Sequence, residues 1–418
     1  MEQPTATKAQ APFVVMAKPV GSRCNMKCDY CYYLATEYPQ ASDLLMSADT
    51  LEHLIRQYIE ASPGPVVSFT WHGGEPTLAG LDFFRTAVAL QKKYLPAGWS
   101  CWNSLQTNGL LLDDAWCAFL AAEHFDVGLS IDGTAPIHDT HRRDLGGSAT
   151  HDRTAGAIAL LKKHGVRPDL LCTVNAATLQ DPVGVYRALR RYDTGWIQFI
   201  PIVATDAHGN PTPQSVSAQG YGAFLCAVFD QWSCYDLGQL DVQLFAEMAQ
   251  VLSGGAPSLC WMAPTCGRAV IAEHDGGIYA CDHFVDTAHC LGNIATAHLG
   301  TLVDAPAQIH FGNAKRDTLP QTCRDCRWLA FCHGGCPKDR LPGTGINTLC
   351  AGLQAFFAHS AEPLRHIVQQ RRQKIPYPQI MADMRTRAQA KWKNIGRNDL
   401  CPCGSSKKAK NCCWSFKP

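Results

Sequence analysis

The sequence predicts an α/β protein: a partial (β/α)6 barrel, then a loop-rich region of spaced cysteines, and last a small cysteine-bearing tail. Three observations predict this fold class. Short apolar runs alternate with amphipathic stretches from Phe13 to about Pro201, as in parallel strands joined by helical crossovers. Most of these runs end directly in a polar or glycine-bearing motif. Finally, fifteen of the 21 cysteines fall into three spaced groups.

Six apolar runs are the strand candidates, and the amphipathic stretches between them are the helix candidates. In the first helix, apolar residues recur at 3.6-residue spacing after Ser47, which is a suitable N-cap. The expected strands are Phe13–Ala17, Val66–Trp71, Cys101–Thr107, Asp126–Ile131, Leu170–Val174 and Trp196–Ile200. The other expected helices lie near Leu81–Tyr94, Asp113–Glu123, Arg153–His164, Pro182–Arg191 and Tyr221–Tyr235.

A chain of 418 residues is too long for one ordinary core, so we expect two or three domains. Their expected bounds are 13–235 for the barrel, 236–370 for the cysteine-rich region, 371–395 for a linker and 396–418 for the tail. The net charge of +1 gives no reason to expect a nucleic acid or a membrane as partner. Residues 1–12 lack the apolar run of a secretory signal, and no segment has the roughly 20 apolar residues that span a bilayer. We therefore expect a cytoplasmic protein with reduced cysteines.

Four motifs follow four of the predicted strands. Cys24–Cys31 comes after the first strand, His72–Pro76 after the second, Gln106–Gly109 after the third and Ser130–Gly133 after the fourth. Loops that follow the strands of a βα barrel lie on one rim and build its active site. We therefore expect these motifs to meet there.

The first cysteine group consists of Cys24, Cys28 and Cys31, with the spacing C-x3-C-x2-C. Three thiolates leave one iron of a [4Fe–4S] cluster open, and that iron can bind the amino and carboxylate groups of S-adenosylmethionine (SAM). Electron transfer from such a cluster to SAM yields a 5′-deoxyadenosyl radical. The alternative is a zinc loop whose fourth ligand lies elsewhere in the chain.

The second group supplies eight thiolates, which equal two complete four-cysteine sites. Two [4Fe–4S] clusters and two zinc sites satisfy this count equally, so the spacing alone does not separate them. The members are Cys260, Cys266, Cys281, Cys323, Cys326, Cys332, Cys336 and Cys350. The third group forms two close pairs that supply one tetrahedral zinc site. Its members are Cys401, Cys403, Cys412 and Cys413.

The motifs at the strand ends resemble those of the radical SAM superfamily. In that family the GGEP motif binds the SAM amino group, so the resemblance assigns Gly73, Gly74 and Glu75 to SAM. Tyr30 takes the aromatic position before the last cysteine, and Ser130 takes the position that contacts the methionyl end of SAM. The tail resembles the SEC-C motif, a small zinc module.

The later cysteines resemble the SPASM extension of radical SAM enzymes that modify peptides and proteins. Together with Trp71–Pro76, Gln106–Gly109, Gly334–Arg340 and Leu349–Leu353, they are similar to the anaerobic sulfatase-maturating enzymes, over Phe13–His366. The resemblance implies two auxiliary [4Fe–4S] clusters besides the radical cluster. One set of ligands would be Cys260, Cys266, Cys281 and Cys336, and the other Cys323, Cys326, Cys332 and Cys350.

That family oxidises a cysteine or serine of a sulfatase to Cα-formylglycine without oxygen. The resemblance implies an unfolded or nascent sulfatase with a Cys/Ser-x-Pro-x-Arg motif as substrate, and a flavodoxin- or ferredoxin-type one-electron reductant. It also implies that Asp282 is the base that removes a proton after radical formation. A solvated loop acid is the alternative for Asp282. The alternative functions are another SPASM-type peptide modifier, which forms thioethers or crosslinks, and a non-enzymatic protein with several zinc sites.

Overall fold

The computed structural model describes residues 7–35, 44–205, 211–400 and 408–411 of the chain. The chain divides into two compact units, and several separate stretches contribute to each of them. The first unit comprises Met1–Ser130, His141–Asp169 and Thr265–Asp317. The second unit comprises Ile131–Thr140, Leu170–Pro264 and Thr318–Pro418.

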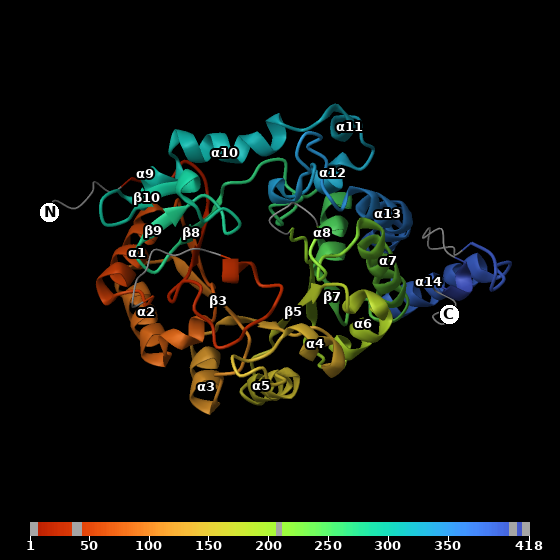
Figure 1. The fold of residues 1–418 in the computed structure, drawn as a ribbon, viewed down its shortest axis with the longest axis horizontal. Coiled ribbons are helices and arrows are strands. Elements are labelled where there is room, and N and C mark those ends of the chain that lie inside the picture. Colours follow the sequence, from red (N-terminus) through yellow and green to blue (C-terminus); the bar gives the residue numbers. More distant parts are fainter. Residues whose placement is uncertain (1–6, 36–43, 206–210, 401–407, 412–418) are drawn as a thin grey trace. The chain divides into compact units, whose positions relative to one another are not determined.

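The first unit contains a sheet with the strand order β10-β9-β8-β1-β2-β3-β4 (Figure 1). Neighbours from β8 to β4 run parallel, whereas β9 is antiparallel to both β8 and β10. The strands are β1 (Val14–Ala17), β2 (Val66–Trp71), β3 (Ser100–Thr107), β4 (Asp126–Ser130), β8 (Ala269–Ala272), β9 (Gly277–Tyr279) and β10 (Cys290–Asn293). The helices are α1 (Ala48–Ala61), α2 (Leu81–Tyr94), α3 (Asp114–Ala122), α5 (His151–Lys163), α9 (Leu299–Val303) and α10 (Pro306–Asp317), with short 3-10 turns at Tyr32–Ala35 and Pro76–Ala79.

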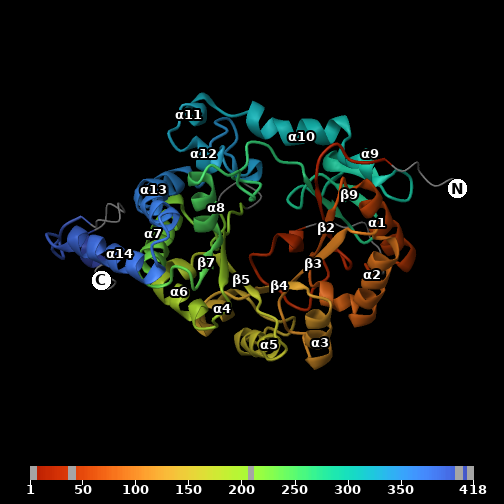
Figure 2. The same cartoon turned by 180° about the vertical axis from the view of Figure 1, so that it is seen from behind.

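Helix α1 shows how the crossover helices are fixed to the sheet. Ser47 is its N-cap, as predicted, and the Ser47 hydroxyl accepts a hydrogen bond from the Thr50 backbone N–H at 3.1 Å. Tyr58 is buried on the inner face, and its hydroxyl donates to the carbonyls of Phe13 and Ser68, each at 3.0 Å. One helix is thereby joined to the β1 and β2 segments, whose following loops carry the first two motifs. Figure 2 shows α1 and α2 alongside each other next to β2 and β3.

The six predicted strands are all present, and their ends differ from the prediction by one residue at most. Strand β8, which pairs in parallel with β1 through Val15 and Val270, was not predicted from the sequence. Strand β8 has only four residues, and its partner β1 lies far away along the chain, so no local sequence pattern predicts the pairing. This pairing brings the segment after β8 to the carboxyl end of β1.

The second unit combines three parallel strands with a cluster of helices. Aromatic side chains of three helices form its core: Phe229 lies 5.2 Å from Phe245 and 6.2 Å from Phe356 between ring centroids. The strands are β5 (Asp169–Val174), β6 (Trp196–Pro201) and β7 (Asp241–Val242). The helices are α4 (Ala135–His141), α6 (Pro182–Arg190), α7 (Ala218–Tyr235), α8 (Gln243–Leu252), α11 (Gln321–Arg324), α12 (Leu329–Cys332), α13 (Cys350–Arg372) and α14 (Tyr377–Trp392).

Helix α14 occupies the segment in which the sequence analysis expected a linker. Its residues Ile380, Met381 and Met384 are buried, and the helix contacts α7 and α13. The prolines that suggested a linker fit the start of a helix: Pro376 is the N-cap and Pro378 lies in the first turn, where no backbone N–H is needed. Among the described residues, none of the helices combines the length and the apolarity that crossing a bilayer requires.

Candidate active site

The loop after β1 carries the first three cysteines, Cys24, Cys28 and Cys31. Burial raises the pKa of the Cys24 thiol to about 12, and the charges of Glu75 and of the other two thiols act in the same direction, although the Met26 backbone N–H opposes them. Such a thiol stays protonated at neutral pH until a metal displaces its proton. Without a metal, Cys24 therefore does not act as a thiolate at neutral pH.

Backbone contacts tie the GGEP motif to the residues just before Cys24. The Gly74 N–H donates to the Gly21 carbonyl and the Glu75 N–H donates to the Arg23 carbonyl, both at 2.9 Å. A Cβ atom on Gly74 would lie 2.1 Å from the Arg23 carbonyl oxygen, so only glycine permits this approach. The glycine thus fixes the cysteine loop to the end of β2.

The Glu75 carboxylate is 1% exposed and receives four hydrogen bonds from the protein itself. The Thr77 backbone N–H and hydroxyl donate to Oε1 at 3.1 and 2.6 Å. The Thr107 hydroxyl donates to Oε1 at 2.8 Å, and the Asn108 backbone N–H donates to Oε2 at 2.7 Å. Burial raises the pKa of Glu75, and these donors counteract the rise. The side chain therefore joins the motifs after β2 and β3.

Two further hydrogen bonds connect the motifs of the first unit. The Asn108 side-chain amide donates to Asn25 Oδ1 at 2.7 Å, which joins the motif after β3 to the cysteine loop. Gln106 Nε2 donates to the Ser130 hydroxyl at 3.0 Å, which joins the motifs after β3 and β4. Tyr30 accepts a hydrogen bond from the Arg142 guanidinium at 2.9 Å. The expected meeting of the four motifs is therefore observed for the parts that lie in this unit.

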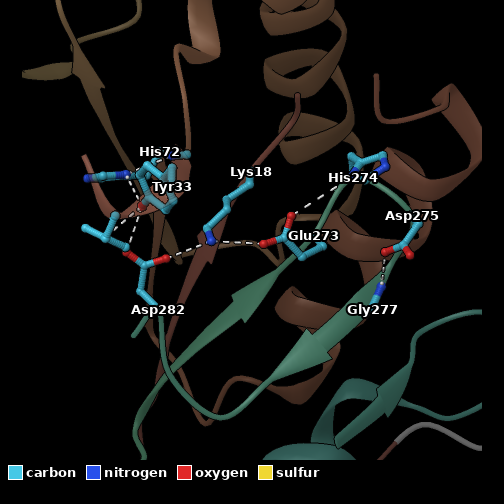
Figure 3. Close-up of polar contacts among 10 residues, drawn as sticks. Lys18, Tyr33, His72, Glu273, His274, Asp275, Gly277 and Asp282 are labelled. Atoms are coloured by element: carbon cyan, nitrogen blue, oxygen red, sulfur yellow. Dashed lines mark hydrogen bonds and ion pairs between the residues drawn. The ribbon is translucent and has the colours of Figure 1, made fainter. Parts of the chain in front are cut away.

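Asp282, which follows Cys281 in the sequence, contacts several polar side chains (Figure 3). The Lys18 ammonium is 2.8 Å from Asp282 Oδ1. The other oxygen, Oδ2, accepts a hydrogen bond from the Tyr33 hydroxyl at 2.7 Å and a second one from the Tyr32 hydroxyl. The side chain is 13% exposed, so Asp282 is not a solvated loop acid.

Charges around Asp282 keep it ionised. Burial raises the pKa of the Asp282 carboxyl, but the charges of Lys18 and His72 and the hydrogen bonds of Lys18 and Tyr32 outweigh burial and lower it to about 2. His72 lies behind the cluster, with Nδ1 3.0 Å from the Tyr33 hydroxyl and accepting the Gly73 N–H at 2.8 Å. At neutral pH Asp282 is therefore deprotonated, which is the form that a base requires.

Most residues of this cluster were not predicted from the sequence. Lys18 and His72 each follow a strand directly, and Tyr32 and Tyr33 follow the last cysteine of the first group. Such positions are typical of active-site residues, so these four residues could have been predicted. Glu273, which binds the far side of Lys18 at 2.9 Å, follows the unpredicted strand β8 and carried no such signal.

One side chain joins the loops of two cysteines in the first unit. Gln308 Nε2 donates to the Gly267 carbonyl at 2.7 Å and to the Ala280 carbonyl at 3.2 Å. Gly267 follows Cys266, and Ala280 precedes Cys281. Helix α10 therefore holds these two cysteine loops together.

The second unit contains a cavity of about 100 Å³ around four cysteines. Its walls also include the apolar side chains of Trp328, Leu353 and Phe357. Burial, with the charges of the other three thiols, raises the pKa of the Cys332 thiol to about 11. Four thiols around one largely apolar cavity suit a four-cysteine iron–sulfur cluster. The thiols are those of Cys323, Cys326, Cys332 and Cys350.

The remaining predicted ligands are divided between the second unit and the tail. Cys260 and Cys336 lie in the second unit; burial raises the pKa of the Cys336 thiol to about 11, and the charges of Asp339 and Cys260 contribute. Among the described residues, no three His, Cys, Asp or Glu side chains converge as the ligands of a single ion do. In a cubane, each thiolate binds a different iron. The tail cysteines lie outside the described residues: Cys401, Cys403, Cys412 and Cys413.

Comparisons with known proteins agree with these motifs. Residues 19–183 match the Radical SAM superfamily, residues 260–327 match the SPASM iron–sulfur cluster-binding domain, and residues 397–415 match the SEC-C motif. The chain is 38% identical over 383 residues to a serine-type anaerobic sulfatase-maturating enzyme of Bacteroides thetaiotaomicron, with 86% of this chain and 92% of the relative covered. It is 32% identical over 361 residues to a cysteine-type enzyme of Clostridium perfringens, with coverage of 84% and 96%.

A solved structure shares the fold over most of the chain. Native anSMEcpe with bound AdoMet and the Cp18Cys peptide superimposes with a TM-score of 0.80 at 31% identity, over 86% of this chain and 100% of that one. The predicted fold class, an α/β radical SAM fold with a SPASM region, is thereby confirmed.

Proposed function

This chain belongs to the anaerobic sulfatase-maturating enzymes, and from this premise we propose that it oxidises a cysteine or serine of a sulfatase to Cα-formylglycine by radical SAM chemistry. The observation that carries the proposal is the Asp282 cluster. An ionised carboxylate, held by Lys18 on one oxygen and by tyrosine hydroxyls on the other, lies in the same unit as the motif of three cysteines and the GGEP motif. A reaction that removes a hydrogen atom and then a proton from the substrate needs both features.

The cysteines divide into a radical site and two auxiliary sites in this proposal. Cys24, Cys28 and Cys31 hold the radical cluster, and Gly73, Gly74, Tyr30 and Ser130 contribute to the SAM site. Glu75 acts on that site by joining two of its loops. The auxiliary sets are Cys260, Cys266, Cys281 and Cys336, and Cys323, Cys326, Cys332 and Cys350. When bound, the radical cluster and SAM would supply the 5′-deoxyadenosyl radical that takes a hydrogen atom from the substrate Cβ, and an oxidised auxiliary cluster would accept the electron released afterwards.

Asp282 performs the protein's own part of the chemistry. The substrate Cβ loses a hydrogen atom, one electron and the proton of its S–H or O–H group. We assign this proton to Asp282 Oδ2, because its partners there are the hydroxyls of Tyr32 and Tyr33, which can turn to accept a hydrogen bond from a protonated carboxyl, whereas the Lys18 ammonium at Oδ1 can only donate. A cysteine gives a thioaldehyde, which water hydrolyses to the aldehyde with release of hydrogen sulfide, and a serine gives the aldehyde directly.

The partners and the remaining domain follow from the same premise. The substrate is an unfolded or nascent sulfatase with a Cys/Ser-x-Pro-x-Arg motif, and the electron donor is of the flavodoxin or ferredoxin type. We place the reaction in the cytoplasm, where thiols stay reduced. The SEC-C tail, residues 396–418, binds one zinc ion through its four cysteines.

A peptide assay tests the function. Reduced, reconstituted protein is incubated anaerobically with SAM and a Cys-x-Pro-x-Arg or Ser-x-Pro-x-Arg peptide, and the peptide mass is measured. We expect a mass decrease that matches formylglycine and that requires SAM. An otherwise identical peptide with alanine at the first position should stay unchanged. A thioether or crosslink mass in place of formylglycine would establish the alternative SPASM-type activity.

A further inference from the structure

We propose that Lys18, supported by Glu273, is a positioning residue that fixes the Asp282 carboxylate for proton removal. The inference rests on the function proposed for Asp282 above. Lys18 lies between two carboxylates, with Nζ 2.8 Å from Asp282 Oδ1 and 2.9 Å from Glu273 Oε1 (Figure 3). Neither Lys18 nor Glu273 belongs to any of the cysteine motifs.

Burial makes this ion pair different from the surface pairs of the chain. The Lys18 side chain is fully buried, and that of Glu273 is 2% exposed. Burial lowers the pKa of Lys18, but the two carboxylates outweigh burial and raise it, so the side chain carries its charge. A buried ammonium without partners would be strongly destabilising, whereas a paired one restricts its partners to one geometry.

Both residues are themselves fixed by the sheet. Lys18 follows β1 directly, and its backbone N–H donates to the Ala272 carbonyl at the end of β8 at 2.8 Å. Glu273 is the next residue after Ala272, and its N–H donates to the Gly277 carbonyl at 2.9 Å. The pairing of β1 with β8 therefore places the ammonium and its second carboxylate side by side, before any contact with Asp282.

The Lys18 stem also contacts the loop that resembles a SAM-binding motif. A Cβ atom on Gly73 would lie 3.1 Å from Cβ and Cγ of Lys18, so the glycine leaves room for the lysine. The ammonium lies 4.7 Å from the centre of the Tyr33 ring, and the Tyr33 hydroxyl binds Asp282 Oδ2. Because Lys18 holds Oδ1, the carboxylate cannot rotate freely, and the orientation of Oδ2 relative to this loop is fixed.

The test removes the anchor without changing the local net charge. Lys18→Met/Glu273→Gln deletes one positive and one negative charge, and such buried replacements are often tolerated by the fold. The single variant Glu273→Gln keeps the contact between Lys18 and Asp282. An exposed pair, Lys93 with Glu52 at 2.7 Å, provides the matched control Lys93→Met/Glu52→Gln.

Iron content, 5′-deoxyadenosine, formylglycine and the unfolding temperature of the metal-free protein are measured for each variant. We expect the double variant to keep its iron and its 5′-deoxyadenosine production, while formylglycine formed per 5′-deoxyadenosine falls about 10²-fold, the usual effect of a misplaced catalytic group. Glu273→Gln should lower this ratio less, and the surface control should not change it. An unchanged ratio in the double variant overturns the proposal, as does a parallel loss of both products with a lower unfolding temperature.

A crystal structure of the same double variant supplies a readout that does not depend on turnover. We expect the Asp282 carboxylate to leave the orientation in which Oδ2 meets Tyr33. Retention of that orientation overturns the positioning role. Absence of formylglycine from the wild-type protein would instead contradict the proposed function, and the structural comparison would still decide the role of Lys18.

Discussion

Asp282 takes its chemical character from side chains that come from three separate parts of the chain. In the sequence, Lys18 precedes the first cysteine group and Tyr33 follows it, and His72 directly precedes the GGEP motif. With a pKa of about 2, Asp282 is always ionised at neutral pH, but it is a weak base. A weak base is sufficient if the substrate loses its electron first, because oxidation of the radical makes the S–H or O–H proton strongly acidic.

Replacement of Asp282 by asparagine tests this role. Asp282→Asn keeps the side-chain volume and the neighbouring Cys281, but removes the basic carboxylate. Because proton removal follows radical formation, we expect normal iron content and continued 5′-deoxyadenosine production. Formylglycine should fall about 10²–10⁴-fold, the usual cost of losing a general base. Deuterium from the substrate Cβ should still appear in 5′-deoxyadenosine.

Asp286→Asn is the matched control, since Asp286 is 51% exposed on the same loop and binds only local partners. It should leave formylglycine production unchanged. A wild-type yield from Asp282→Asn would rule out Asp282 as an essential base.

At the scale of elements, the short loops after the parallel strands hold one another in place. Glu75 joins the loops after β2 and β3, and Gly74 joins the loop after β2 to the cysteine loop. The cysteine loop therefore depends on the GGEP motif for its position, whether or not the motif also binds SAM. A substitution at Gly74 should therefore lower the iron content of the protein first.

Gly74→Ala tests this dependence, because its Cβ would collide with the Arg23 carbonyl. We expect the reconstituted variant to lose about four of about twelve irons, one cubane's content, and with them SAM cleavage. Gly156→Ala in helix α5 is the control, because its Cβ meets nothing within 4 Å and alanine favours a helix. Full iron content in Gly74→Ala would show that the cysteine loop tolerates displacement from the GGEP motif.

Local patterns in the sequence predicted the strands and helices of the barrel region, since each depends on spacing within a few residues. They also predicted that the motifs after β2 and β3 meet, because parallel strands end at one edge. The pairing of β1 with β8 could not be predicted in this way, and with it the partnership of Lys18 and Glu273 was missed. Asp282 was identified only through a family resemblance, because a single aspartate carries no spacing signal.

At the scale of the whole molecule, the two proposed auxiliary sets differ in how the chain supplies them. The second set lies entirely in the second unit, around one cavity. The first set takes Cys266 and Cys281 from the first unit, and Cys260 and Cys336 from the second. Folding of the second unit can therefore bring the four thiols of the second set together.

The C-terminal region can be divided into helix α14 and the SEC-C tail, for which we propose zinc binding. Truncation after Ile395 removes the SEC-C motif and keeps α14. We expect this protein to lose its zinc and to retain both its unfolding temperature and its turnover of short peptides. Truncation after Pro376 also removes α14 and exposes the surfaces of α7 and α13 that it covers.

This shorter protein should unfold at a clearly lower temperature, since each large apolar side chain that is buried contributes about 1.5–3 kcal/mol. The buried apolar side chains that are lost with α14 are those of Ile380, Met381, Met384 and Trp392. Zinc analysis, thermal unfolding and the peptide assay are compared for the two truncations and the full chain. Equal stability of both truncations would show that α14 adds nothing to the second unit. Loss of short-peptide turnover after removal of the tail alone would make the SEC-C motif part of the active enzyme, whereas a loss confined to a full-length sulfatase would assign it to partner docking.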